Sequence, residues 1–184
     1  MSLIEVVVTG YSIIVAFCLA RLLDGIRPAT QSESMYWVHL VWILNKIMNV
    51  LITYWVTWSY SSENLSFVQF LLTLFPAILI YLQCDALVTK QPEQIASWKE
   101  HYYHVSKYFF GMNVALGLGL IAQAVFAGSS NFPTPIYLML CAMILVSGVG
   151  YVAKTHAVHR VLAVISFLNL SVGVPAYLSM ATLS

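Results

Sequence analysis

The run that decides the fold is MYWVHLVWILNKIMNVLITYWVTWS, residues 35–59. A membrane-spanning helix needs about 20 mostly apolar residues to cross a hydrocarbon core of about 30 Å. The run exceeds this length, and the one charged side chain in it, Lys46, stands near its middle. The stretch therefore predicts a transmembrane helix with an ionisable group deep inside it.

Further apolar runs of similar length fill most of the remaining chain. With the first, they predict six membrane-spanning helices at about 3–26, 35–59, 65–88, 105–127, 135–153 and 157–183. The breaks between the runs carry turn residues, such as Arg27-Pro28 and Gly128-Ser129-Ser130-Asn131. We therefore expect an all-α polytopic membrane protein, a six-helix bundle that forms a single transmembrane domain over residues 1–184.

The composition excludes a soluble globular domain and a nucleic-acid-binding protein. Of the 184 residues, 60% are hydrophobic and 8% are charged, whereas a soluble domain carries roughly 25% charged residues. Eight Lys and Arg against seven Asp and Glu give a formal charge of +1, so no basic field is available to hold a nucleic acid. The partner expected from composition is the lipid bilayer.

The basic residues predict the orientation of the bundle. Seven of the eight fall on one side of the six-helix serpentine, around its first, third and fifth connections: Arg21, Arg27, Lys90, Lys99, Lys107, Lys154 and Arg160. The positive-inside rule places that side in the cytoplasm. Both termini are therefore expected outside, which for a bacterial inner membrane is the periplasm.

The third connection is the longest, and it predicts a short interfacial helix over about residues 92–104. Ile95, Trp98 and Tyr102 recur there at helical spacing. Trp98, Tyr102 and Tyr103 would then lie among the lipid headgroups, where amphipathic rings are enriched. An amphipathic linker is the alternative to a lipid-recognition role for this segment.

Lys46 is the most informative residue for function. It lies about eleven residues from each end of its run, which at 1.5 Å per residue is roughly 16 Å from either interface. An ammonium at that depth costs about 2.5 to 3.5 kcal/mol on insertion scales unless it meets partners or water. It should face the protein interior, on a helix face that also carries His39, Trp42, Asn49 and Thr53, with Asn45 beside them.

Candidate partners for Lys46 are amides, because no carboxylate reaches the middle of the membrane in this arrangement. Asn113 and Asn169 lie at a similar depth in their helices. Without a carboxylate, Lys46 can lose its proton, or it can hold an anion or a water chain. The pattern favours a small channel or carrier for an ion or small polar solute, with a polar path along residues 35–59. A structural polar core is the alternative.

A second hypothesis follows from small residues in the run at 105–127. Gly111, Ala115 and Gly119 recur every four residues and would let another helix approach closely. This face serves packing within the fold or between subunits. In the latter case the chain would be a non-catalytic membrane subunit that associates with itself or with a partner protein.

A third hypothesis follows from the histidines, which fall toward the cytoplasmic side. His101 and His104, and His156 and His159, have HxxH spacing, which aligns two imidazoles on a helix for one metal ion. The histidines could thus hold a metal or haem, handle protons, or be structural. We find no phosphate loop, nucleophile elbow or HExxH motif, so the sequence does not favour an enzyme and predicts no cofactor.

Several short motifs carry a family resemblance. They are Cys18-Leu19-Ala20-Arg21-Leu22-Leu23, Tyr36-Trp37-Val38-His39-Leu40-Val41-Trp42, Glu100-His101-Tyr102-Tyr103 and Tyr108-Phe109-Phe110-Gly111. On these motifs the chain resembles a family of small bacterial polytopic inner-membrane proteins with no known activity. The resemblance implies an inner-membrane location, and it implies no activity, cofactor or functional residue.

Overall fold

A computed structural model describes the backbone of residues 3–31, 35–59, 67–126 and 134–181, and the side chains of residues 5–31, 35–55, 67–92, 94–125 and 137–172. Within these residues the chain is all-helical, as predicted. The α-helices are α1 (Leu3–Gln31), α2 (Trp37–Ser59), α3 (Phe67–Leu87), α4 (Trp98–Phe126), α5 (Thr134–Val152) and α6 (His156–Ala181), and a short 3-10 turn, η1 (Pro92–Gln94), precedes α4.

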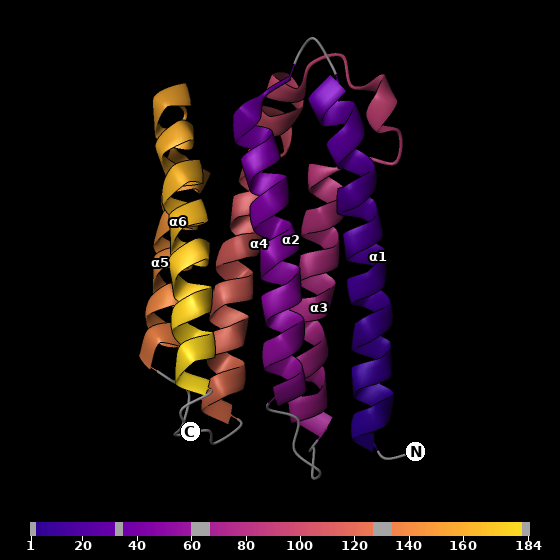
Figure 1. Cartoon of the computed structure of the whole chain (residues 1–184), viewed down its shortest axis with the longest axis vertical. Coiled ribbons are helices and arrows are strands. Elements are labelled where there is room, and N and C mark those ends of the chain that lie inside the picture. The colour runs from indigo at the N-terminus through magenta and orange to yellow at the C-terminus, as the bar shows by residue number, and fades with distance from the viewer. Residues whose placement is uncertain (1–2, 32–34, 60–66, 127–133, 182–184) are drawn as a thin grey trace.

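The helices run up and down alongside one another, and both ends of the chain lie at the same end of the bundle (Figure 1). Neighbouring helices close a ring in which α1 contacts α2 and α3, α4 follows α3, and α5 and α6 lead back to α2. The second helix also contacts α3 and α4 across this ring. Because α2 touches four other helices, its polar face lies inside the bundle.

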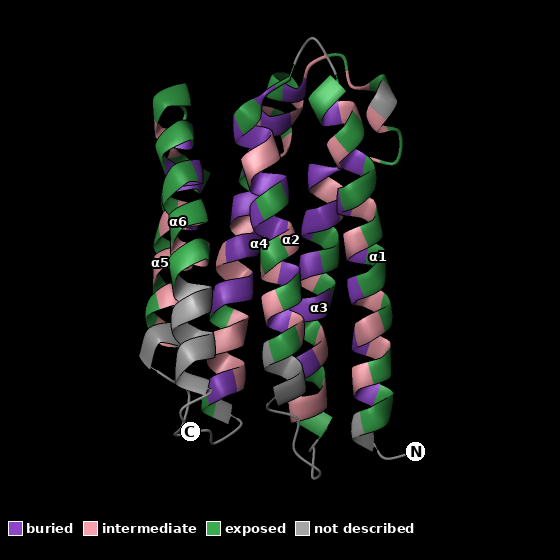
Figure 2. Cartoon of the chain, in the orientation of Figure 1, coloured by how far each residue is buried: buried purple, intermediate pink, exposed green. Residues whose placement is uncertain are grey.

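The outer surface of the bundle is apolar. Large hydrophobic side chains are exposed on every one of the six described α-helices, and Phe17, Leu118, Leu145 and Phe167 are examples (Figure 2). In the described residues, three helical stretches are long and apolar enough to cross a membrane, namely Glu5–Gln31, Phe67–Leu87 and Trp98–Val125, and two shorter apolar ones follow at Tyr137–Val152 and His156–Val172. Such a surface fits a bilayer better than water.

Most helix ends fall where the apolar runs predict them, but α1 continues past Arg27-Pro28 to Gln31. A proline removes one backbone donor and crowds the carbonyl four residues earlier, which the last turns of a long helix tolerate more readily than its middle. In the same turns the Thr30 hydroxyl donates to the Ile26 carbonyl oxygen at 2.9 Å, which helps to satisfy the carbonyls at the end of the helix. The first helix is therefore longer than predicted.

The separate interfacial helix expected over residues 92–104 is not found. Only Pro92–Gln94 form a 3-10 turn, and residues 98–104 are the first two turns of α4. Ser97 caps this helix, because its hydroxyl oxygen accepts a hydrogen bond from the Glu100 backbone N–H at 3.3 Å. Trp98 and Tyr102 are buried in the bundle instead of lying among headgroups, so their helical spacing reflects core packing.

An ion pair joins α1 to α3 near the end of the bundle where the basic residues gather. Arg21 Nη2 lies 3.0 Å from Asp85 Oδ1, and both side chains are partly exposed. Partly exposed ion pairs of this kind are worth about 1 kcal/mol or less. The pair therefore contributes little stability, and its main effect is to fix how α1 is aligned along α3.

The small-residue face of α4 packs within the chain. A Cβ atom at Gly119 would lie 3.1 Å from the Phe75 ring on α3, and one at Gly111 would lie 3.5 Å from Tyr151 on α5. Ala115 between them is half-buried. Of the two uses that the sequence allowed for this face, the described contacts are those within the fold.

A close approach at a glycine between α4 and α5 gives a stability prediction. A Cβ atom at Gly150 would lie 2.7 Å from the Phe110 ring, whereas one at Gly148 would meet nothing within 4 Å. Forcing extra atoms into a packed core costs about 1–3 kcal/mol. We expect Gly150→Ala to lower the unfolding temperature in detergent, followed by circular dichroism, and Gly148→Ala to leave it unchanged. Equal unfolding temperatures for the two variants would contradict this packing.

Candidate functional site

The polar face of α2 is buried as its spacing predicts. His39, Trp42, Asn45, Lys46 and Thr53 all have buried side chains, and Asn49 is half-buried. The opposite face of the same helix carries exposed Leu44, Met48 and Leu51. The alternation follows the helical period, so α2 presents apolar residues outward and a line of polar residues to its neighbours.

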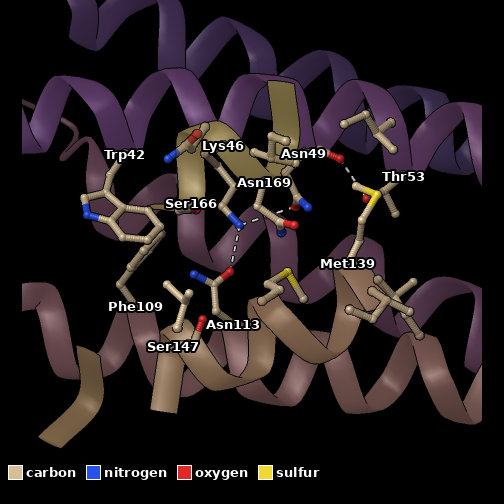
Figure 3. A pocket seen from close by; sticks show the side chains of 17 residues that line it. Trp42, Lys46, Asn49, Thr53, Phe109, Asn113, Met139, Ser147, Ser166 and Asn169 are labelled. Carbon is tan, nitrogen blue, oxygen red and sulfur yellow. Dashed lines mark hydrogen bonds between the residues drawn. The ribbon is translucent and has the colours of Figure 1, made fainter. Parts of the chain in front are cut away.

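Lys46 is hydrogen-bonded to amides from three helices. Its Nζ donates to Gln83 Oε1 on α3, to Asn113 Oδ1 on α4 at 3.0 Å, and to Asn49 Oδ1 one turn along α2 at 3.4 Å. The Phe109 ring centre lies 5.4 Å from Nζ. Figure 3 shows the bonds from Lys46 to Asn49 and Asn113. The side chain is thus held in one place at the centre of the bundle.

This arrangement suits an ammonium group that lacks a counter-charge. An ammonium has three donors and a neutral amine has two, and three amide oxygens surround Nζ. Among the described residues, no carboxylate lies within salt-bridge distance of Lys46. Amide dipoles therefore solvate the positive charge without neutralising it. A ligand that contacts Nζ would have to replace one of the three oxygens, and the longest of the three contacts is the one to Asn49 at 3.4 Å.

A cavity of about 110 Å³ opens beside Lys46, which is room for several water molecules. It lies between four helices, α2, α4, α5 and α6, where Figure 3 shows the side chains converging. Its polar lining comes from Trp42, Asn45, Lys46, Asn49, Thr53, Asn113, Ser147, Ser166 and Asn169. The rest of its lining is apolar or aromatic, as in most small-ligand sites.

Two amides at this site have polar atoms without hydrogen bonds. Neither the amide nitrogen nor the oxygen of Asn45 has a hydrogen-bond partner among the residues that the structure describes, although the side chain is only 3% exposed. Nε2 of Gln83 is likewise buried and unpaired. An unsatisfied buried polar group costs about 1–3 kcal/mol, so native structures usually supply a partner such as water or a ligand. Asn45 therefore offers both a donor and an acceptor that no described protein group uses.

The residues predicted for the polar path come together to different degrees. Asn113 contacts Lys46 directly, and Asn169 lines the same cavity without a hydrogen bond to Nζ among those described. Figure 3 shows Asn169 facing Lys46 and Asn49 across the cavity. His39 lies outside the cavity lining, packed against Trp98 with ring centres 4.9 Å apart.

Sequence reasoning missed Gln83, whose oxygen accepts a hydrogen bond from Lys46. Gln83 stands near the end of α3, so counting residues from the interface put it too far from the membrane centre. Side chains on a helix lean toward its N-terminus, however. The side chain of Lys46 therefore reaches toward the start of α2, which lies at the same end of the bundle as the end of α3 (Figure 1).

The histidines of the predicted metal site lie in separate contacts. Nε2 of His159 is 3.1 Å from the Ala153 carbonyl oxygen, which can only accept, so this nitrogen carries the proton. Nδ1 of His159 then accepts from the Tyr102 hydroxyl at 2.9 Å. Both nitrogens of His159 are occupied, and neither has a lone pair left for a metal ion.

The other members of that set also fail to converge. His101 Nε2 donates to the Leu87 carbonyl oxygen at 3.2 Å, His156 packs on the Tyr103 ring with centres 4.7 Å apart, and His104 is exposed. Among the residues that the structure describes, no three His, Cys, Asp or Glu side chains are grouped so that they could hold a metal ion. His101 and His159 instead contact aromatic rings at one end of the bundle, Trp98 for the first and Tyr102 and Phe110 for the second. His156, like His104, is exposed.

Comparison with known protein families, curated proteins and solved structures returned no match for this chain. Fold alone rarely decides function, and the chemistry of the cavity and of Lys46 is the more informative guide.

Proposed function

We propose that this protein is a small integral membrane channel or carrier for an ion or small polar solute, with its polar path along α2. The observation that carries the proposal is the position of Lys46, a buried cation that borders a cavity and has no carboxylate partner within the described part of the chain. A purely structural lysine would be expected to have its charge neutralised, since burying an unpaired ion is costly. Residues that carry such a cost inside membrane segments are commonly functional.

The orientation of the bundle belongs to the same proposal. We place it in a bacterial inner membrane with six spans, because seven basic residues gather at the end of the bundle opposite to both chain ends. Positively charged loops stay in the cytoplasm, so the N- and C-termini would be periplasmic.

The two other hypotheses have less support from the described contacts. Self-association through Gly111, Ala115 and Gly119 would use a face on which Gly111 and Gly119 already contact Tyr151 and Phe75 of the same chain. A metal or haem protein would need histidine nitrogens with free lone pairs, and both nitrogens of His159 are hydrogen-bonded. The transport proposal needs neither a free helix face nor a free histidine nitrogen.

A flux assay with the purified full-length chain tests the proposal. The protein is reconstituted into liposomes, and uptake of a panel of small solutes is compared with protein-free liposomes. The panel holds sodium, potassium, chloride, nitrate, formate and glycerol. We expect at least one of them to cross several-fold faster with protein present, at a rate proportional to the protein content. If no solute in the panel crosses faster, the transport proposal fails.

A further inference from the structure

We propose that the cavity binds a small monovalent anion, held by the ammonium of Lys46 and by the side-chain amide of Asn45. This inference rests on the proposed function, because it names the class of solute that the polar path would accept. It is argued from the charge of the cavity, from the direction of its amide groups and from its size.

The charge of the cavity has one sign. Lys46 contributes a positive charge, and the lining contains no Asp, Glu or other ionised side chain. In a low-dielectric interior, an uncompensated charge attracts its counter-ion far more strongly than it would in water. A monovalent anion would neutralise Lys46, whereas a divalent anion would leave one negative charge buried and unpaired.

The amides around Lys46 add hydrogen-bond donors. The side-chain oxygens of Asn49 and Asn113 point at Nζ (Figure 3), so their NH₂ groups point away from the ammonium. Both residues line the cavity. These NH₂ groups are donors that an anion in the cavity could accept from.

Asn45 is an independent indication of a ligand. Its amide lines the cavity beside Lys46, is almost completely buried, and makes no hydrogen bond within the described protein. Asn45 and Lys46 border the same cavity, so an anion bound there could meet both the ammonium and this amide. The unpaired Nδ2 of Asn45 would then gain the partner that it lacks.

The size of the cavity restricts the anion. A volume of about 110 Å³ accommodates a halide or a small oxyanion such as nitrate or formate with some of its water. The apolar and aromatic part of the lining, which includes Phe109 and Met143, disfavours strongly hydrated multivalent ions. Small, weakly hydrated anions therefore suit the site best.

Equilibrium binding tests this inference without requiring transport. The purified full-length protein in lipid nanodiscs is titrated with sodium chloride against sodium gluconate at constant ionic strength, and its unfolding temperature is followed. A ligand that binds the folded state raises this temperature in a saturable way. We expect such a rise with chloride and with nitrate, and no change when potassium replaces sodium.

Two variants and a control assign the binding to the site. Lys46→Gln keeps a polar side chain but removes the charge, and Asn45→Leu keeps the volume but removes the donor. Hydrogen bonds to a charged group are stronger than those between neutral groups. We therefore expect each variant to need at least about tenfold more chloride than wild type to reach half of the maximal increase in unfolding temperature. Met48→Leu, on the exposed face of α2, should behave like wild type. If one of the two variants fails to fold, the chloride titration of the other still tests the site.

The outcomes separate this inference from the proposed function. A wild type without a saturable rise, or unchanged titrations in both variants, overturns the anion site. Chloride binding that Lys46→Gln weakens, in a protein that moves no solute through liposomes, supports the anion site and removes the transport function. Flux of glycerol or cations without any anion binding supports the transport function and overturns the anion site.

Discussion

Replacing Lys46 by leucine is expected to reduce solute flux in liposomes to the level of protein-free vesicles, while the bundle stays folded. The substitution removes the only charge that borders the described cavity and puts an apolar side chain into its wall. Without the ammonium, a permeating ion loses the group that compensates its dehydration. Initial rates of uptake, normalised to the amount of reconstituted protein, measure the effect.

Retention of the fold is part of this prediction. Breaking an ion pair strands a buried charge, but Lys46 has no charged partner among the described residues, and its removal leaves only neutral amides. The oxygens of Asn49 and Asn113 lose a donor, and water in the cavity that both residues line can replace it. The helical circular dichroism signal should therefore be unchanged.

Two matched variants isolate the role of the charge. Met48→Leu alters an exposed residue two positions along the same helix and should leave flux at the wild-type rate. Lys46→Arg keeps a permanent positive charge and should keep a measurable part of the flux, reduced because the larger guanidinium crowds the cavity. Wild-type flux in Lys46→Leu would show that the path does not pass this residue.

The sequence predicted the helices well because the membrane pattern is strong. Apolar runs of about 20 residues broken by turn residues leave little choice of secondary structure. The start of α4 was missed because the run was counted from its first apolar stretch, at 105. Ser97 and Glu100 have the Ser-x-x-Glu spacing of a capping box. The observed Ser97 cap shows that this spacing could have predicted the start of the helix.

The site was predictable in part. Helical spacing on one helix was enough to bring His39, Trp42, Lys46 and Thr53 to a common buried face. Contacts between helices depend on how far each helix is shifted along the bundle and on the direction of long side chains, and neither follows from spacing. Gln83 was therefore overlooked as a partner of Lys46. The cavity could not be predicted, because it arises where four helices pack imperfectly.

The second large effect is expected for reporters fused after Ser184. With seven basic residues around the first, third and fifth connections, the charge bias is too large for a single substitution to reverse. A C-terminal alkaline phosphatase, which is active only in the periplasm, should give strong activity in cells. A C-terminal fluorescent protein that matures only in the cytoplasm should stay dark. The same reporters fused after Lys90, within the third connection, should give the opposite pattern and serve as the matched control.

A cytoplasmic C-terminus would mean that one span has been miscounted, and α5 is the span to question. Gly148 and Gly150 lower its hydrophobicity, and at Thr134–Val152 it is the shortest of the six described helices. Its 19 residues nevertheless extend about 28 Å at 1.5 Å per residue, close to the thickness of the hydrocarbon core. Five spans would also carry Lys154 and Arg160 to the outside, against the charge rule. Length and charge both favour a periplasmic C-terminus.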